Sequence, residues 1–136
     1  MAFSLAALAL LAGNSSPATL TVTVTEIEHT RGKLIACLWT EKSGFPTCQK
    51  SDSAKRQTVA ISGATMRVTF RNVAPGSYAV SVQHDEDGDG KLKTNFLGMP
   101  KEGVGISNNP GGIPRWSKSQ VDISGDTAIS IRMRYL

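Results

Sequence analysis

The sequence lacks most of the residue patterns that enzymes use for catalysis. It has only two histidines, His29 and His84, to serve as imidazole acids or bases near neutral pH. It has no Gly-x-Ser-x-Gly elbow, no phosphate-binding glycine loop, no cysteine-histidine signature and no cluster of zinc-ligand residues. These absences disfavour an enzyme. The alternative that stays open is a small periplasmic hydrolase that uses His84 with Asp85 or Glu102.

Long runs of basic residues are also missing. The fifteen lysines and arginines are scattered along the chain, and no run is longer than Lys55-Arg56. The net charge of +4 favours anionic surfaces or ligands, but a nucleic-acid-binding protein would gather its basic residues into a stripe or patch. We therefore expect a solvated basic surface and no nucleic-acid partner.

The sequence contains no apolar run of about 20 residues, the length that a transmembrane helix needs. Residues 1–12 are uncharged and largely apolar, as in the h-region of a secretory signal, although a basic n-region is missing. Small residues upstream of Thr19 suit cleavage there, and an earlier cut near Ala12 or Gly13 is the alternative. We therefore expect a signal segment over 1–18, a single domain over 19–136, and a periplasmic or secreted location without a transmembrane span.

Only two cysteines are present, Cys37 and Cys48. They are the only possible intrachain pair, and a disulfide between them would persist in an oxidising compartment. Closing a loop of about ten residues would stabilise the fold by about 3 kcal/mol in the chain-entropy model. The alternative is a buried thiol at Cys37, which lies in an apolar segment, and a free Cys48.

No stretch has a sustained helical period, whereas period-two alternation of apolar residues recurs along the chain and predicts strands. Turn residues at Ser62-Gly63, Pro75-Gly76 and Gly125-Asp126 separate apolar runs and predict hairpins. We expect an all-β fold, an antiparallel β-sandwich of about seven strands. The expected strands lie at residues 20–25, 33–39, 59–61, 66–71, 78–84, 121–123 and 129–135.

The connection over residues 94–118 interrupts this rhythm. A segment of this length without clear structure is usually functional or mobile, and a plain crossover between sheets is the alternative. Its aromatic residues Phe96 and Trp116 are candidates for presenting a surface to a partner.

An acidic loop follows the strand expected at 78–84. Four of the eleven acidic residues lie between Asp85 and Asp89, and like charges this close repel unless solvent or a cation neutralises them. Asp85, Asp87 and Asp89 match positions one, three and five of the twelve-residue calcium loop, and Gly90 matches position six. The carbonyl of Lys91 would serve as the ligand at position seven, so the loop predicts a Ca²⁺ site.

The match to the calcium loop ends after position seven. Lys93 stands at position nine and Phe96 at position twelve, where a bidentate glutamate is needed. A further ligand must come from elsewhere, and Glu102 or the side-chain oxygen of Asn95 are the candidates. Such a site would resemble weak extracellular sites, with a Kd of about 10⁻⁴–10⁻³ M. The alternative is a solvated turn rich in Asp and Gly that holds no metal.

Two segments near the loop carry a family resemblance. They read HDEDGDGKLKTN over residues 84–95 and LGMPKEGVGISNN over residues 97–109, and PGSYAV precedes them at residues 75–80. With these motifs the chain resembles the uncharacterised bacterial exported family known as domain of unknown function 2141. The resemblance implies a periplasmic or secreted β-sandwich, similar to transthyretin-like (prealbumin-like) and carboxypeptidase-regulatory-like modules, and it implies no established activity.

The chain departs from the pattern of that family at three positions. The family usually carries Asn where Asp87 and Asp89 stand, so this copy is more acidic and better suited to calcium. It usually carries Asp where Lys93 stands, which removes a possible ligand at position nine. The motifs imply that the acidic loop and the connection 97–109 form one surface, on which Glu102 is available to the loop.

These features favour an exported, non-enzymatic binding or structural module. Its acidic loop would hold Ca²⁺ and order the long connection, and the surface formed would meet a glycan, a peptide or an envelope protein. Besides the small hydrolase, the other alternative is an envelope structural component with no metal, in which the loop is only a turn.

Overall fold

The computed structural model describes residues 17–91 and 102–135 of the chain. Most of the expected signal segment therefore lies outside the described residues, as do Lys93, Asn95 and Phe96. Two short helices, η2 (Cys48–Lys50) and α2 (Trp116–Ser119), lie in connections between strands. The strands are β1 (Ala18–Thr25), β2 (Lys33–Trp39), β3 (Lys55–Ala60), β4 (Met66–Val73), β5 (Gly76–Asp85), β6 (Val104–Ile106), β7 (Gln120–Ile123) and β8 (Thr127–Arg132).

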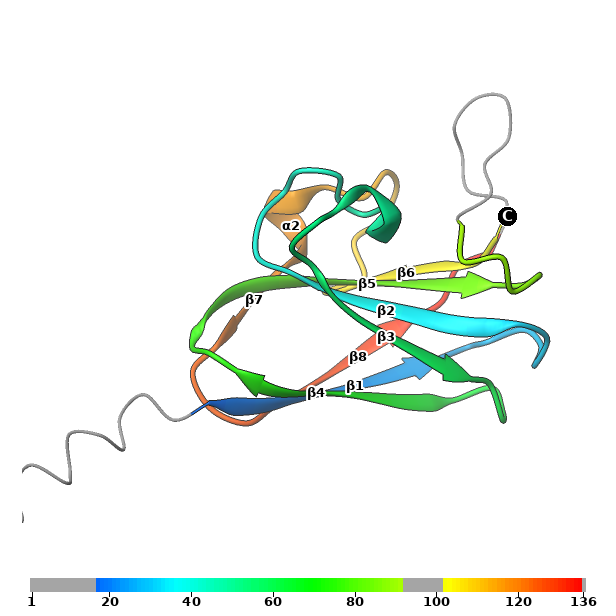
Figure 1. Cartoon of the computed structure of the whole chain (residues 1–136), viewed down its shortest axis with the longest axis horizontal. Coiled ribbons are helices and arrows are strands. Elements are labelled where there is room, and N and C mark those ends of the chain that lie inside the picture. The colour runs from blue at the N-terminus through cyan, green and yellow to red at the C-terminus, as the bar shows by residue number, and fades with distance from the viewer. Residues whose placement is uncertain (1–16, 92–101, 136) are drawn as a thin grey trace, which may run out of the picture.

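The strands form two sheets that pack face to face (Figure 1). One sheet has the order β4-β1-β8, and the other has the order β3-β2-β5-β6 with β7 also paired to β5. The predicted all-β sandwich is confirmed. The strand that the sequence analysis missed is β6, which has only three residues and lies within the long connection.

Strand pairing differs from the prediction at the turns. Ser62-Gly63 joins β3 to β4, Pro75-Gly76 joins β4 to β5, and Gly125-Asp126 joins β7 to β8, and each pair of strands is divided between the two sheets. The predicted hairpins at these turns are therefore wrong, and the turns carry the chain across the sandwich. After crossing from β7 to the other sheet, β8 runs beside β1 and pairs with it in parallel. The other strand pairs are antiparallel.

The core lies between the two sheets and explains the alternation in the sequence. The inner face of β1 buries Leu20, Val22 and Val24 completely, and its threonines face outward and are only partly buried. On the facing sheet β2 contributes Leu34, Ala36 and Leu38 to the same core. The remaining members include Val68 and Phe70 of β4, Val80 and Val82 of β5, and Ile131 of β8.

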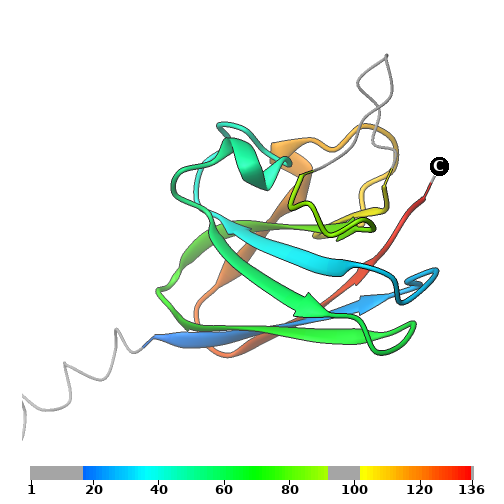
Figure 2. The same ribbon diagram turned by 45° about the vertical axis from the view of Figure 1, so that its right-hand side comes forward.

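A second, smaller core covers the outer face of the five-stranded sheet. Ile35, Cys37 and Trp39 of β2 are buried there beneath the connection from β2 to β3, so β2 is covered on both faces. Cys37 and Cys48 form a disulfide with a Cα–Cα distance of 6.1 Å, as predicted, and it ties η2 to β2. Figure 2 shows this connection and α2 lying on the outer side of the sheet.

Trp116 belongs to this outer cover. Its ring packs edge-on against Phe45 with a centroid distance of 5.4 Å, and Phe45 packs in the same way on Trp39. The half-buried Trp116 therefore helps to attach α2 to the sheet. Among the described residues, no helix has the length and apolarity to cross a membrane.

The motif Pro75-Gly76-Ser77-Tyr78 has a structural role at the start of β5. The Tyr78 hydroxyl donates a hydrogen bond of 2.6 Å to the carbonyl of Ala74, four residues upstream. A tyrosine that bonds back to the preceding backbone is typical of corners in β-sandwiches. This bond fixes the crossing from β4 to β5 at the end of the sandwich opposite the acidic loop (Figure 1).

Candidate functional site

The acidic loop begins where β5 ends. Alternation along β5 sends Val82 and His84 to the inner side of the sheet, and Gln83 and Asp85 to the outer side. The loop then turns sharply, with the Gly88 amide donating to the Asp85 carbonyl at 3.3 Å and with Gly90 at a φ of 78°. Because side chains disfavour positive φ, the glycine at position six of the motif has the conformational role that the calcium-loop pattern assigns to it.

Three carboxylates converge in this loop. Oxygen atoms of Asp85, Asp87 and Asp89 lie within 4.8 Å of one another. Asp87 and Asp89 are exposed, whereas Asp85 is only 2% exposed. The spacing of the three aspartates in the sequence therefore does bring their side chains together, where β5 ends on the outer face of the sheet.

Asp85 is the most unusual member of the group. Its Oδ2 accepts a hydrogen bond of 2.7 Å from the Gly90 amide, but its Oδ1 is buried and has no hydrogen-bond partner among the described residues. Burial raises the pKa of the Asp85 carboxyl, the Gly90 amide lowers it, and the neighbouring Asp87 and Asp89 carboxylates raise it further. An ionised Asp85 therefore needs a compensating positive charge that the described side chains do not supply at Oδ1.

The two exposed aspartates also shape the loop backbone. Oδ1 of Asp87 accepts from the Asp89 amide at 3.4 Å, and Oδ1 of Asp89 accepts from the Lys91 amide at 2.9 Å. Such turns between a side chain and the backbone two residues on are typical of Asp. They place successive carboxylates on one side of the loop, as a cation site requires. The ligand role expected for the Lys91 carbonyl stays a prediction.

Glu102 also reaches the loop, as the motifs implied. This residue is 4% exposed, and its Oε2 accepts a hydrogen bond of 2.7 Å from the Glu86 amide. The Gly103 carbonyl accepts from the His84 amide at 2.8 Å, and β6 pairs with β5 directly after it. The segment beginning at Glu102 is thus joined to the loop. However, the Glu102 carboxylate bonds to the backbone of the loop and is not one of the three carboxylates that converge. The role of Glu102 as a metal ligand therefore stays a prediction.

His84 lies on the inner side of the strand in a network of its own. The ring is fully buried, and its Nε2 lies 2.7 Å from the Arg31 carbonyl, which can only accept, so Nε2 carries the proton. Nδ1 therefore accepts from the Tyr135 hydroxyl at 2.7 Å, and that hydroxyl in turn accepts from the Glu28 amide at 3.2 Å. Both nitrogens of His84 are occupied, as in a structural histidine.

His29 completes the network at the surface. Its ring lies 4.5 Å from the His84 ring, and its Nε2 is 2.5 Å from Oε1 of Glu86. These three side chains form a second group whose potential ligand atoms lie within 4.8 Å of one another. Because both His84 nitrogens already have protein partners, this group fits a metal less well than the aspartates do. His84 and Asp85 lie on opposite faces of β5, so the geometry does not favour a pairing of these two residues in the hydrolase alternative, whereas the pairing of His84 with Glu102 stays a prediction.

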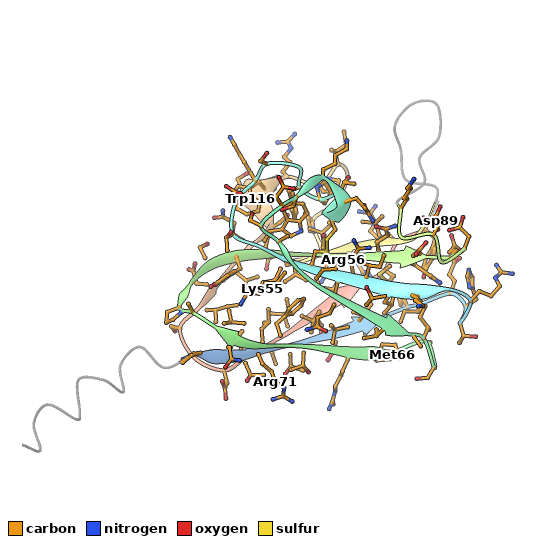
Figure 3. The ribbon with its side chains drawn as sticks, in the orientation of Figure 1. Lys55, Arg56, Met66, Arg71, Asp89 and Trp116 are labelled. Atoms are coloured by element: carbon orange, nitrogen blue, oxygen red, sulfur yellow. A yellow bond between two sulfur atoms is a disulfide. The ribbon has the colours of Figure 1, made fainter. Side chains whose placement is uncertain are left out.

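Beside the three aspartates the surface has an open hollow of about 470 Å³. Thr47, Gln49 and Lys50 line it from the connection before β3, and Arg56 lines it from β3 itself. Its remaining wall is formed by residues 89–91 of the acidic loop, and two of the lining residues, Arg56 and Asp89, are labelled in Figure 3. The four lining residues outside the acidic loop were not predicted from the sequence, because they come together only in the folded chain; they are Thr47, Gln49, Lys50 and Arg56.

Gln83 is the other residue that the sequence analysis missed. Its position two residues before Asp85 on the same strand was the available signal, because such residues share a face. Gln49 Nε2 donates to Oε1 of Gln83 at 3.0 Å and to the Gly90 carbonyl at 2.5 Å, so Gln49 bridges the sheet and the loop. Gln83 is 6% exposed, and its Nε2 has no hydrogen-bond partner among the described residues.

Comparison with known proteins identifies a family but no function. Neither the search of curated proteins nor the search of solved structures gave a match. A family model described as an uncharacterized protein conserved in bacteria (DUF2141) matches residues 22–131, which include most of the sandwich and the acidic loop. The chain therefore belongs to this DUF2141 family of bacterial proteins.

Proposed function

We propose that this protein is an exported, non-enzymatic binding module whose acidic loop holds Ca²⁺ through Asp85, Asp87 and Asp89. The observation that carries the proposal is the buried Oδ1 of Asp85, which has no hydrogen-bond partner among the described residues. A buried, unpaired carboxylate oxygen is costly, and a cation bound by all three carboxylates would remove that cost. The convergence of their oxygens within 4.8 Å gives such an ion its ligands.

The donor set favours calcium over other metals. All three side-chain ligands are carboxylates, which hard cations prefer, and nitrogen or sulfur ligands of the kind that select zinc are not part of the group. An open surface loop of this kind also suits the flexible geometry of Ca²⁺ better than the strict octahedron of Mg²⁺. The further ligands would be water, the Lys91 carbonyl or Glu102, and a Kd of about 1 mM is expected for so incomplete a shell.

The export part of the proposal is supported by the disulfide, and the weak calcium site proposed above would agree with it. The bond between Cys37 and Cys48 persists in oxidising compartments such as the periplasm or the extracellular medium. A calcium site with a millimolar Kd is typical of extracellular modules. The expected signal segment agrees with this location.

The ion would act by fixing one end of the sandwich. The loop bonds to the segment that begins at Glu102, to Gln49 and to Arg56, so a bound ion would stiffen contacts with three separate parts of the chain. A surface fixed in this way would present a defined shape to a glycan, a peptide or an envelope protein.

Calcium titration of the melting temperature tests the proposal. The protein is first stripped with a chelator, and the melting temperature is then followed as Ca²⁺ is added up to 10 mM. Ligand that binds only the native state stabilises it by RT ln(1 + [L]/Kd), so a Kd of about 1 mM predicts a rise of about 5 °C. Asp87→Asn with Asp89→Asn should abolish most of this rise.

Asp122→Asn is the matched control. Asp122 is also an exposed aspartate, but it lies on β7 opposite Ser77, at the end of the sheet away from the loop. This variant should keep the full response to calcium. An unchanged melting temperature of the wild-type protein at 10 mM Ca²⁺ would refute the calcium site and leave the structural component without metal as the better interpretation.

A further inference from the structure

The hollow beside the acidic loop has features of a ligand site. We propose that it binds an acidic saccharide, with a uronate carboxylate held by Lys50, Arg56 and Lys91. This inference rests on the proposed calcium site, because the hollow and that site share Asp89. The proposal names the class of partner that the binding module recognises.

Three parts of the fold converge to build the hollow. Lys50 is the last residue of η2, which the disulfide at Cys48 fastens to β2. Arg56 lies on β3 opposite Cys37, and its Nη2 is 3.4 Å from the Gly90 carbonyl. Gln49 joins the same carbonyl to the sheet at 2.5 Å. The disulfide thus fixes η2 on the sheet, and hydrogen bonds join Gln49 and Arg56 to the acidic loop, which favours a preformed site.

The charges that line the hollow favour an anion. Lys50, Arg56 and Lys91 contribute three positive charges, and Asp89 is the one acidic residue in the described part of the lining. Calcium bound at Asp89 would offset that negative charge and add a further positive centre at the edge of the hollow. A carboxylate is the anion expected here, because it can bond to lysine and arginine donors and also approach a calcium ion.

The neutral groups of the lining favour a saccharide over an acidic peptide. Thr47 offers a hydroxyl and Gln49 an amide, and both suit the hydroxyl groups of a sugar. Among the residues that the structure describes, the lining contains no aromatic or aliphatic residue that would hold the apolar side chains of a peptide. Gln49 is held in place by its hydrogen bond to the buried Gln83 at 3.0 Å, so its amide has a defined position in the lining.

The dimensions of the hollow agree with a short oligosaccharide. Its volume of about 470 Å³ lies within the range of about 300–1,000 Å³ typical of small-molecule sites. Its open shape would allow a longer polymer to continue past the bound unit.

Calorimetric titration with a trimer of galacturonic acid tests the proposal. The expected result is binding in the presence of calcium, weaker binding in chelator, and none with a neutral galactose trimer. Lys50→Gln should weaken binding by about tenfold, since it removes one charged hydrogen-bond donor. Arg71→Gln is the control, because this exposed arginine lies on β4, on the opposite side of the molecule from Asp89 (Figure 3), and should leave the affinity unchanged.

The calcium response of the wild-type melting temperature separates the two proposals. If calcium raises the melting temperature but the acidic trimer does not bind, the saccharide site is refuted and the calcium site stands. Equal affinity of the wild type and the Lys50→Gln variant for the trimer also overturns the saccharide site. Equal affinity for a triglutamate peptide overturns the choice of a saccharide. If calcium has no effect on melting, the calcium site itself is refuted.

Discussion

Asp85 occupies a position at which a carboxylate is costly without a cation. Its side chain combines nearly complete burial, one hydrogen bond from Gly90 and one oxygen without a partner among the described residues. Asparagine has the same shape and can still accept the Gly90 bond, but it carries no charge. The metal-free and metal-bound proteins should therefore respond in opposite ways to Asp85→Asn.

In chelator at pH 7, the free energy of unfolding of the Asp85→Asn variant should equal that of the wild type or exceed it by about 1 kcal/mol. The pKa of Asp85 is raised in the folded protein, so between the ordinary carboxyl pKa and this raised value the folded state binds more protons than the unfolded state. The wild-type stability contributed by Asp85 therefore falls as pH rises through this window. Urea unfolding across pH should show this fall in the wild type and its loss in the variant.

The Asp85→Asn variant and the wild type should also differ in their response to calcium. Asp85→Asn should lose the stabilisation by calcium, because the variant has no carboxylate at the centre of the site. A variant less stable than the wild type in chelator by 2 kcal/mol or more would mean that Asp85 has an ordinary structural role.

Tyr135 contributes to stability through His84. Tyr135→Phe removes the hydroxyl that donates to Nδ1 of the buried His84, so the variant should lose about 1–3 kcal/mol of unfolding free energy in urea. Tyr78→Phe is the matched comparison, since its hydroxyl bonds to the carbonyl of Ala74, which is exposed and can be hydrated instead. A smaller loss for Tyr135→Phe than for Tyr78→Phe would contradict the structural role of this network.

At the scale of elements, the connection between β2 and β3 depends on the disulfide. A bridge between residues separated by 11 positions should stabilise the fold by about 3 kcal/mol in the chain-entropy model. Cys37→Ala with Cys48→Ala should lose an amount of this order in urea unfolding, and added reductant should destabilise the wild type but not the variant. Equal stability of both proteins without reductant would contradict this prediction.

Elements with a strong local signal could be predicted from the sequence. The alternation in β1, β4 and β8 reflects one buried face, and the apolar run in β2 reflects burial on both faces. The short strand β6 gave no such signal, because its three residues include Gly105 and its pairing with β5 is formed across more than twenty residues of chain. The strand β6 is recognisable only from its pairing with β5 in the folded protein.

The candidate site also contains some residues that have a local sequence signal and others that do not. The aspartates at positions 85, 87 and 89 could be predicted as a group, because their spacing lies within a single loop. Glu102 could be connected with the loop only through a family resemblance. Contacts such as Gln49 with Gln83, which are 34 residues apart, have no local sequence signal and depend on how β2, β3 and β5 are arranged.

At the scale of the whole molecule, the crossings between sheets determine where the site lies. The chain passes from one sheet to the other after β1, β3, β4 and β7, so β5 becomes the centre of the larger sheet and contacts β2, β6 and β7. The sequence could not predict these crossings, because a Pro-Gly or Ser-Gly turn suits a hairpin and a crossing equally well. The end of β5 is thereby brought beside η2, β3 and the segment that begins at Glu102.

A crystal structure of the protein grown with 10 mM calcium would test the central claim most directly. We expect an ion in the acidic loop with Asp85 Oδ1 and oxygens of Asp87 and Asp89 at about 2.3–2.6 Å, together with further oxygen ligands. Growth with a chelator should give the same loop without the ion. A structure in calcium that shows only water against Asp85 Oδ1 would contradict the account.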